Sequence, residues 1–357
     1  MKNVVVIGAG NAGSIVANKL QSLGINVTVI ERSEFSFYQP GVIDVAFGDA
    51  RKEDVIKPVK EAVKANIIKD EVVKVDVENH SVVTSSGKTI GYDYLVIAPG
   101  AENKRLEGFP SWHSLEDLEL LKQQIDKFDG NKIVIGYYGV IKCPAAPFEF
   151  AYFFRRRFPR AEITLLNPVT QPPEIQKPMA ELLGKLAKDY KINVIRGFKI
   201  RDIDRNSKTI ISEDGQKVTY DLALIDTPIR AGKAFENLTD NTGFIPVDKY
   251  SLRYKDYDNV FAIGDVTNIM IPPKTGGLAH FEAKFVANSI YADINGYEKK
   301  RFDGSALCAI YGGSDRGMLV KMNYEKGSIA GPSSLFYIAK RSFMKLYWNT
   351  LKGNFII

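Results

Sequence analysis

Cys143 and Cys308 are the residues of this sequence whose side chains offer the most distinctive chemistry. The 357-residue chain has only these two cysteines, which excludes a disulfide-rich scaffold and a zinc or iron–sulfur site built on cysteines. Cys143 comes shortly before Pro147, where a helix is expected to begin. A thiol just before a helix N-terminus is expected to have a lowered pKa and more thiolate character. The alternative is that Cys143 is a small buried apolar residue.

The second cysteine is far from the first in sequence. Cys308 lies in the apolar segment 306–313, 165 residues further on, so only the fold can bring the two thiols together. Two interpretations stay open, a redox pair or two structural cysteines. His80, His113 and His280 are scattered along the chain, which predicts that the protein has no metal centre.

A glycine-rich turn follows an apolar run at the start of the sequence. Residues 3–13 read NVVVIGAGNAG, and a continuous Val/Ile run is typical of a strand buried on both faces in a parallel sheet. Gly8 permits a tight turn, Gly10 lets the backbone approach a pyrophosphate, and Gly13 allows close packing of the next helix. The spacing therefore predicts a dinucleotide-binding loop.

The elements around this turn have the order that such a loop requires. A helix is expected over 14–22 and a second apolar strand over 26–30, which ends in Glu31. An acid about twenty residues after the first glycine is placed to bind a ribose hydroxyl. The alternative is a glycine-rich turn of an α/β domain that holds no ligand.

A second strand-and-turn unit in the middle of the chain has lost its glycines. A strand is expected over 132–136, but Tyr138 and Ile141 stand at the second and third glycine positions. A tyrosine is a steric obstacle where a backbone must touch a pyrophosphate. The next strand, 162–166, is followed by Asn167 rather than an acid. We therefore expect that this unit does not bind NAD(P)H productively.

Two other strands end in segments that complete a pattern. Residues 92–97 lead into Ala98-Pro99-Gly100, and residues 259–263 lead into Gly264-Asp265. Together with the first glycine loop, these segments resemble the flavoproteins that have two dinucleotide-binding domains. The resemblance covers nearly the whole chain and implies an α/β fold with two Rossmann-like domains and FAD as the first nucleotide.

The resemblance also implies a division of the chain. The FAD-binding domain is expected to be discontinuous, at residues 1–102 and 235–325. A degenerate NAD-like domain, residues 103–234, is inserted and carries Cys143. Residues 326–357 are expected to form a C-terminal amphipathic segment that associates with a membrane.

The motif around Cys143 narrows the resemblance. The run Cys143-Pro144-x-x-Pro147-Phe148-Glu149 in the degenerate domain is similar to that of sulfide:quinone oxidoreductases and of flavocytochrome c sulfide dehydrogenases. Residues 307–313, which include Cys308, resemble the segment that carries the second cysteine of these families. Residues 274–277 and 31–48 resemble segments that lie beside the flavin. The resemblance implies that the two cysteines meet over the flavin as a redox disulfide.

One departure from the family concerns a third cysteine. Many relatives have one shortly after the position of Gly100, but residues 101–138 contain none. We therefore expect non-covalently bound FAD and two sulfur-handling residues.

Individual roles follow from the resemblance. The implied catalytic residues are Cys143, Cys308, Glu149 as a proton relay, and Lys274, which would stabilise negative charge on reduced flavin. The implied cofactor-binding residues are Gly8, Gly10, Asn11, Ala12, Gly13, Glu31, Arg32, Gln39, Pro40, Val72, Ala98, Pro99, Gly100, Gly264, Asp265, Lys274, Thr275 and Gly276. The implied quinone contacts are Gly41, Tyr311, Phe336, Phe343 and Tyr347. The alternatives are that Glu149 only pairs with a helix N-terminus, that Lys274 is a surface lysine, and that the aromatic residues pack in the core.

The end of the sequence is basic and aromatic. Residues 326–357 contain five basic residues and no acidic one, so they account for five of the six units of net positive charge. The basic character therefore belongs to this segment and does not indicate a nucleic-acid partner. In the expected helix, an apolar face holds Leu335, Ala339, Phe343, Leu346 and residues 350–351, and another face holds Arg341, Lys345 and Lys352. Such a helix suits the headgroup layer of a membrane. The alternative is a terminal helix packed on the core or a dimer contact.

The expected activity is the oxidation of hydrogen sulfide to sulfane sulfur or polysulfide, with two electrons passing through FAD to a membrane quinone. With no signal peptide and no apolar run of about 18 residues, we expect a peripheral protein on the cytoplasmic side of the cell membrane. The alternatives are a type II NADH:quinone oxidoreductase, a sulfide oxidoreductase that uses a cytochrome, and a flavin redox sensor with a regulatory disulfide. Homo-oligomerisation, the quinone type and the length of the sulfur product stay open.

Overall fold

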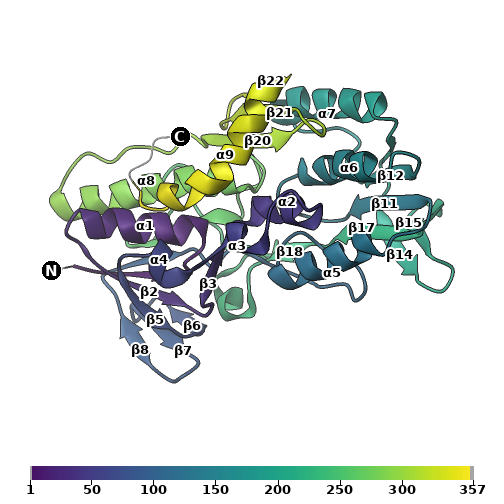
Figure 1. The fold of residues 1–357 in the computed structure, drawn as a ribbon. Coiled ribbons are helices and arrows are strands. Elements are labelled where there is room, and N and C mark those ends of the chain that lie inside the picture. The colour runs from purple at the N-terminus through teal and green to yellow at the C-terminus, as the bar shows by residue number, and fades with distance from the viewer. Residues whose placement is uncertain (1, 354–357) are drawn as a thin grey trace.

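The computed structural model describes residues 2–353, and its first sheet is the one that the N-terminal apolar run predicts. Five parallel strands have the order β19-β9-β1-β2-β5. Their bounds are β1 (Asn3–Ile7), β2 (Asn26–Glu31), β5 (Asn66–Lys69), β9 (Tyr94–Ile97) and β19 (Val260–Ala262). Helices α1 (Asn11–Ser22) and α8 (Gly276–Asn295) lie side by side on one face of this sheet (Figure 1).

Both faces of this sheet are covered, which explains the unbroken run of valines. Val4 and Val6 pack in the core formed with the helices, whereas Val5 and Ile7 pack in a separate apolar cluster with Val82. That cluster lies against a three-stranded antiparallel sheet. Its strands are β6 (Val72–Asp76), β7 (Ser81–Thr84) and β8 (Thr89–Gly91).

The middle of the chain repeats this arrangement. A four-stranded parallel sheet has the order β13-β12-β11-β17 and carries a second antiparallel sheet, β14-β15-β16. The parallel strands are β11 (Lys132–Tyr137), β12 (Glu162–Asn167), β13 (Asn193–Arg196) and β17 (Leu222–Asp226). The antiparallel strands are β14 (Ile200–Asp204), β15 (Thr209–Ser212) and β16 (Lys217–Thr219), and the helices are α5 (Leu115–Asp126), α6 (Ala146–Arg157) and α7 (Lys177–Asp189). The expected pair of Rossmann-like α/β units is confirmed.

The chain passes between the two units twice. The two crossings pair with each other as antiparallel strands β10 (Glu102–Asn103) and β18 (Ile229–Arg230). The remaining elements of the two units are short. They are β3 (Phe35–Phe37), β4 (Ile56–Pro58), α2 (Val42–Ala46), α3 (Lys52–Val55), α4 (Val59–Ala62), and the 3-10 helices η1 (Gln39–Gly41), η2 (Glu174–Gln176), η3 (Lys233–Leu238) and η4 (Gly264–Val266).

The C-terminal part forms a third body that spans the other two. Strands β20 (Ala306–Tyr311), β21 (Gly317–Met322) and β22 (Gly327–Ser333) form an antiparallel sheet, and α9 (Ser334–Thr350) packs across it. In Figure 1 α9, in yellow, lies over the junction of the two units. The expected start of the tail, residue 326, falls in the turn between the paired strands β21 and β22. Within residues 2–353, no helix has the length and apolar character needed to cross a membrane.

Candidate active site

The N-terminal glycine loop is tightly packed on one side and open on the other. Gly8 has φ +93°, and a Cβ there would lie 2.5 Å from the carbonyl oxygen of Ala98. A Cβ on Gly13 would lie 1.9 Å from the carbonyl oxygen of Gly8. In contrast, among residues 2–353 no atom beyond the adjoining residues lies within 4 Å of the position that a Cβ on Gly10 would take. The open space lies where the sequence predicts that a pyrophosphate approaches the backbone.

Two helix N-termini meet at this loop. Helix α1 begins at Asn11 without a side-chain cap, so its first N–H groups are available to an anion. The Asn11 side-chain nitrogen donates to the carbonyl oxygen of Gly276, the first residue of α8, over 2.7 Å. The other end of the amide, Asn11 Oδ1, is buried without a hydrogen-bond partner. These unsatisfied groups fit a dinucleotide cofactor.

Glu31 closes the same loop from the end of β2. One carboxylate oxygen accepts the N–H of Ala9 and the other accepts the N–H of Ser33, both over 2.6 Å. Each oxygen keeps capacity for a further donor, so the position remains suited to a ribose hydroxyl.

Most of the other predicted cofactor residues lie near the glycine loop or the cysteine segment, but Arg32 and Val72 do not. Gly264 donates its N–H to the buried Glu282, and Asp265 lies 3.7 Å from the ammonium of Lys142, next to Cys143. Arg32 instead pairs with surface carboxylates, and the side chain of Val72 packs in the core beneath the first sheet. Predicted residues that lie at or beside the glycine loop or in the segment after β3 are Ala12, Gln39, Pro40, Pro99 and Gly100.

Lys274 is not a surface lysine. Its side chain is buried, and its ammonium group donates to the carbonyl oxygens of Thr267 and Ile269. Burial lowers the pKa of Lys274 to about 8, although the carboxylates of Asp265 and Glu282 oppose the change. Lys274 stands just before α8, whose first residue, Gly276, contacts the glycine loop through Asn11.

The fold brings the two cysteines to one pocket. Cys143 comes from the segment before α6 and Cys308 from β20, and both line a small apolar pocket. The other lining residues are Pro144, Ala145, Met179, Pro272, Pro273, Thr275, Ala306, Ile310, Val320 and Met322. Both cysteines are free thiols. The Cys143 N–H donates to the carbonyl oxygen of Lys274 over 2.8 Å, which ties the pocket to the start of α8.

The two thiols have different hydrogen-bonding environments. Burial raises the pKa of Cys308, but the hydroxyl of Thr275 and the N–H of Gly277 donate to its sulfur and oppose this rise. Burial raises the pKa of Cys143 to about 12, and Glu149 adds to the increase. The expected lowering of the Cys143 pKa is therefore wrong, because desolvation of the thiol outweighs the effect of the helix N-terminus.

A buried ion pair lies next to the cysteines. Glu149 Oε1 accepts from the ammonium of Lys340 over 2.5 Å and from the N–H of Tyr311 over 2.7 Å. The side chains of Lys340 and Glu149 are 6% and 7% exposed. Lys340 also lies 4.1 Å from the centre of the Tyr311 ring. Its charge lowers the pKa of both thiols.

A second ion pair ties the same helix to the first domain. Arg341 and the hydroxyl of Tyr311 both donate to Oδ1 of the buried Asp44, each over 2.6 Å. Arg341 also donates to the carbonyl oxygen of Asp49. Lys340 and Arg341 thus connect α9 to carboxylates of α6 and α2, which belong to different domains.

The predicted quinone contacts fall into three places. Gly41, Phe343 and Tyr347 surround Tyr38, whose ring lies 6.2 Å from Phe343 and 4.5 Å from Tyr347. Tyr311 is fully buried with its hydroxyl on Asp44. Phe336 packs on β21 and β22 at Gly317 and Gly331.

The expected apolar face of α9 is divided between core and solvent. Its buried residues are Lys340, Met344, Tyr347, Trp348 and Thr350, followed by the buried Leu351. The outer side exposes Leu335, Ile338 and Leu346, which are 71%, 59% and 43% exposed. Arg341 does not share the outer side with Lys345 and Lys352, because it is paired with Asp44. Residues 354–357 of the expected tail lie outside the described residues.

The carboxyl end of the second parallel sheet has a polar contact where an NAD ribose acid would stand. Tyr137, the last residue of β11, donates its hydroxyl to Asn167 at the end of β12 over 2.8 Å. Both side chains are buried. This contact adds to the argument from Tyr138 and Ile141 against an NAD(P)H site.

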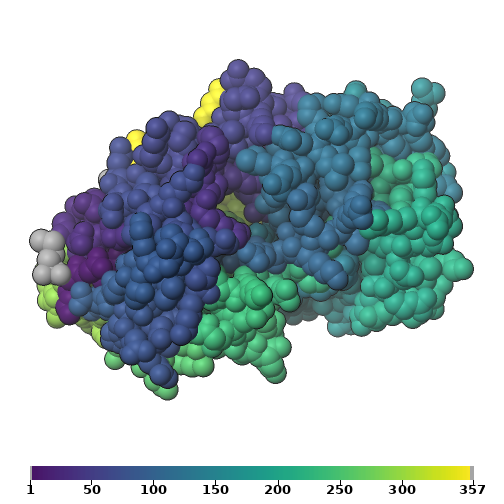
Figure 2. Space-filling model, turned by 90° about the horizontal axis from the view of Figure 1, so that it is seen from below, coloured from purple at the N-terminus to yellow at the C-terminus, as the bar shows by residue number. Residues whose placement is uncertain are grey.

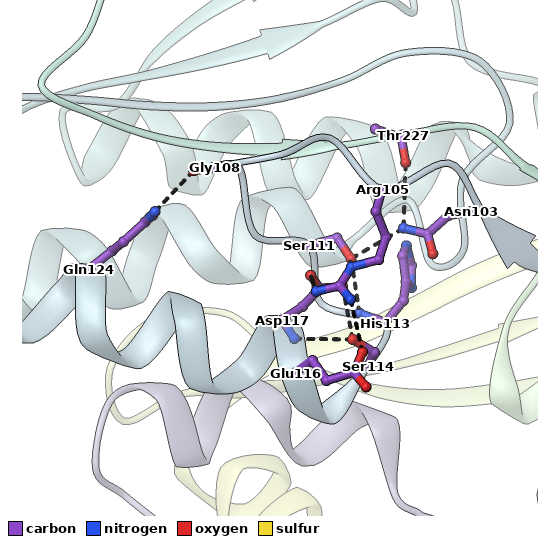
Figure 3. Close-up of polar contacts among 10 residues, drawn as sticks. All are labelled: Asn103, Arg105, Gly108, Ser111, His113, Ser114, Glu116, Asp117, Gln124 and Thr227. Carbon is purple, nitrogen blue, oxygen red and sulfur yellow. Dashed lines mark hydrogen bonds and ion pairs between the residues drawn. The ribbon is translucent and has the colours of Figure 1, made fainter. Parts of the chain in front are cut away.

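The segment without a third cysteine forms a polar network instead (Figure 3). Ser111 donates to Asp117, which also receives Arg105, and the N–H of His113 donates to Ser111. The imidazole of His113 continues this network to Asp226. Among residues 2–353, no group of three or more His, Cys, Asp or Glu side chains could hold a metal ion.

The architecture and the glycine loop define a flavoprotein with two dinucleotide-type domains, the first of which carries the complete glycine pattern. Residues 2–284 match the family described as pyridine nucleotide-disulphide oxidoreductase. The chain belongs to this family; it is an FAD-dependent oxidoreductase, and the open glycine loop described above fits its cofactor.

Named relatives extend over nearly the whole chain. The mitochondrial sulfide:quinone oxidoreductase of Dictyostelium discoideum is 27% identical, with 97% of this chain and 83% of the relative covered. The sulfide-quinone reductase of Aquifex aeolicus is 26% identical, with 88% and 82% covered. The crystal structure of the sulfide:quinone oxidoreductase from Aquifex aeolicus superposes with a TM-score of 0.85 at 22% identity, covering 99% and 92% of the two chains.

Four residues of this site were not singled out for it from the sequence. From the sequence, Lys340 counts only as a tail charge and His113 as an isolated histidine. Asp44 lies in the flavin-side segment 31–48 without a role of its own, and Asp226 belongs to no motif. Each finds its partner on a distant segment, and a charged residue in an otherwise apolar stretch is the only local signal.

Proposed function

We propose that this protein is a sulfide:quinone oxidoreductase that uses Cys143 and Cys308 as a redox pair. The observation that carries the proposal is the apolar pocket shared by the two thiols, next to the start of α8. The other side of that helix start contacts the glycine loop through Asn11. The names of the relatives given above support the same activity.

The first step is thiol–disulfide exchange. In the oxidised enzyme the two sulfur atoms are joined as a disulfide or a trisulfide, and a sulfide ion attacks one of them. One cysteine gains the sulfide sulfur as a persulfide, and the other leaves as a thiolate. We assign the thiolate to Cys308, because Thr275 and Gly277 donate hydrogen bonds to its sulfur. Cys143 then carries the persulfide.

Charges around the pocket serve the electron transfer. FAD, when bound, supplies a two-electron acceptor between the thiolate and the quinone. Lys274 holds a buried positive charge that stabilises the added negative charge. Glu149 relays a proton, and Lys340 keeps its carboxylate in place beside Tyr311. Each oxidised sulfide adds one sulfane sulfur to the product, which leaves as polysulfide, and two electrons leave as quinol.

The quinone enters beneath α9. Gly41, Phe343 and Tyr347 form with Tyr38 an aromatic cluster between η1 and this helix. We propose that a quinone ring binds at this cluster and that Tyr311 and Phe336 border its path.

The outer side of α9 rests on the membrane. Leu335, Ile338 and Leu346 present apolar side chains, and Lys345 and Lys352 are exposed on the same helix and just after it. Such a surface suits a headgroup layer that contains anionic lipids. We propose peripheral association on the cytoplasmic side of the cell membrane.

The domain assignment follows the expected bounds. We propose that residues 1–102 and 235–325 bind FAD, that residues 103–234 supply Cys143, and that residues 326–357 include the membrane contact.

The decisive experiment is anaerobic reduction of the purified flavoprotein. Sulfide should bleach the flavin absorbance quickly, NADH should not, and added quinone should restore the absorbance. Cys143→Ser should abolish bleaching by sulfide while the flavin stays bound. Bleaching by NADH alone would favour an NADH:quinone oxidoreductase, and bleaching by neither would favour a redox sensor.

Membrane association has its own test. Replacing Leu335 and Ile338 together by serine should reduce cosedimentation with vesicles of anionic phospholipid. Leu23→Ser is the matched control, because Leu23 is 40% exposed on another helix end. Equal binding by both variants would contradict the assignment of α9 to the membrane surface.

A further inference from the structure

Three side chains form a hydrogen-bonded chain from one dinucleotide-type domain to the other. Asp226 Oδ1 lies 2.7 Å from His113 Nε2, and His113 Nδ1 lies 2.8 Å from the side-chain nitrogen of Gln39. The side chains of His113 and Asp226 are 3% and 0% exposed. We propose that Asp226 and His113 are positioning residues that orient Gln39, so that its carbonyl oxygen accepts the imide N–H of the flavin ring.

The direction of this chain follows from its buried end. Asp226 Oδ1 already accepts the N–H of Thr227 over 3.0 Å, and a carboxylate oxygen can only accept. His113 Nε2 therefore donates to Asp226. The amide nitrogen of Gln39 faces Nδ1, so Gln39 donates an N–H to this ring nitrogen, which accepts. The Oε1 atom of Gln39 is left as an acceptor, and none of residues 2–353 donates a hydrogen bond to it.

The histidine is held in place from its own backbone. Its N–H donates to Ser111 over 3.3 Å, and Ser111 donates to Asp117 in the first turn of α5 over 2.8 Å. Ser114 caps the same helix and also donates to Asp117. Figure 3 shows these side chains converging beside His113. Such an arrangement fixes the imidazole before any ligand binds, so little ordering is needed on binding.

The location of Gln39 selects the ligand. Asp226 ends β17 in the second sheet, and Gln39 follows β2 and β3 of the first domain. Ligands of open α/β sheets bind in the crevice outside the carboxyl ends of the strands. Figure 2 shows a hollow between the N-terminal part of the chain, in purple, and the middle part, in blue. The flavin ring carries one imide N–H between two carbonyl groups, and a single fixed acceptor matches this donor.

This inference rests on the proposed placement of the flavin ring between the two domains. It is tested with the apoprotein, which is titrated with FAD and with FAD methylated at the imide nitrogen. The methylated cofactor has lost the donor, so the ratio of the two dissociation constants measures this hydrogen bond together with any steric cost of the methyl group. Gln39→Met keeps the length of the side chain but removes the acceptor. This variant should lower the preference for FAD over methylated FAD, measured as the ratio of their dissociation constants, about fivefold.

Asp226→Asn tests the positioning role. An asparagine can present a donor or an acceptor to His113, so the direction of the chain is no longer imposed. We expect this variant to lower the preference for FAD in the same direction as Gln39→Met. Gln124→Met is the matched control, because Gln124 donates to the carbonyl oxygen of Gly108 in the same part of the fold (Figure 3). It should leave the preference unchanged.

Two outcomes would overturn the proposal. An unchanged preference in Gln39→Met would show that another group, or none, accepts the imide N–H. A lowered preference in Gln39→Met with an unchanged one in Asp226→Asn would refute the role of Asp226 in orientation. Both readouts are independent of sulfide, so failure of sulfide to bleach the wild-type flavin would contradict only the proposed activity.

Discussion

Replacing Lys340 by methionine should be among the most damaging single changes in the C-terminal helix. The ammonium of Lys340 lies 2.5 Å from Glu149 Oε1, and both side chains are almost fully buried. Methionine keeps the unbranched shape of the side chain but removes its charge. Glu149 would then keep one hydrogen bond, from the N–H of Tyr311.

The expected magnitude follows from this burial. An exposed ion pair contributes about 0–1 kcal/mol, whereas removal of one partner from a buried pair costs about 3–5 kcal/mol because a carboxylate remains in a poorly solvated site. Lys340→Met should therefore lower the free energy of unfolding of the FAD-loaded protein by about 3–5 kcal/mol, measured by urea denaturation. The double variant Lys340→Met with Glu149→Gln should recover much of this loss.

Thiol reactivity supplies a second readout of the same change. The positive charge of Lys340 lowers the pKa of both Cys143 and Cys308, so its removal should shift the pH profile of thiol alkylation to higher pH. Lys345→Met is the control, because Lys345 is exposed on the same helix. If the two lysine variants have equal stability and equal alkylation profiles, the argument from the buried pair is refuted.

Three further predictions concern the first loop, the second domain and the pH dependence of stability. Gly13→Ala should destabilise the apoprotein, because its Cβ would lie 1.9 Å from a backbone oxygen. Gly10→Ala should leave apoprotein stability nearly unchanged and weaken FAD binding. Thermal unfolding measures the stability of both variants, and flavin titration measures their FAD binding. Tyr137→Phe should lower the free energy of unfolding by about 1 kcal/mol, because the hydrogen bond to Asn167 is lost. A rise in reactivity with NADH would contradict the prediction that this end of the second sheet does not bind NAD(P)H. Burial raises the pKa of Glu282 to about 7 from its usual 4.5. Between these two pH values the folded protein keeps a proton that the unfolded chain releases. The free energy of unfolding therefore falls as pH rises through this range. Glu282→Gln should remove this part of the slope in urea titrations at several pH values, and an identical slope in both proteins would contradict it.

The parts of the fold that the sequence predicts well are those encoded by neighbouring residues. The alternation of Val4 and Val5 between two cores, the turn at Gly8 and the start of α6 close to Pro147 all depend on local pattern or backbone conformation. The prediction that the second unit lacks a nucleotide loop rests on Tyr138 and Ile141, which are local features of the same kind. Local rules transfer directly from sequence to structure.

The parts that the sequence does not predict depend on distant partners. Glu149 and Lys340 are 191 residues apart, and His113 and Asp226 are 113 residues apart. The pKa of Cys143 was expected in the wrong direction because a sequence contains the nearby helix start but not the burial of the thiol. The amphipathic pattern of α9 likewise does not reveal that two adjacent cations, Lys340 and Arg341, have partners in the interior.

The adjacency of Lys340 and Arg341 also sets an order of events during synthesis. Asp44 lies in the first domain and Glu149 in the second. The ribosome makes both residues long before it makes Lys340 and Arg341, which neutralise them. Until α9 docks, burial of either carboxylate carries a penalty. We therefore expect closure of the pocket that Cys143 and Cys308 line to be coupled to docking of this helix.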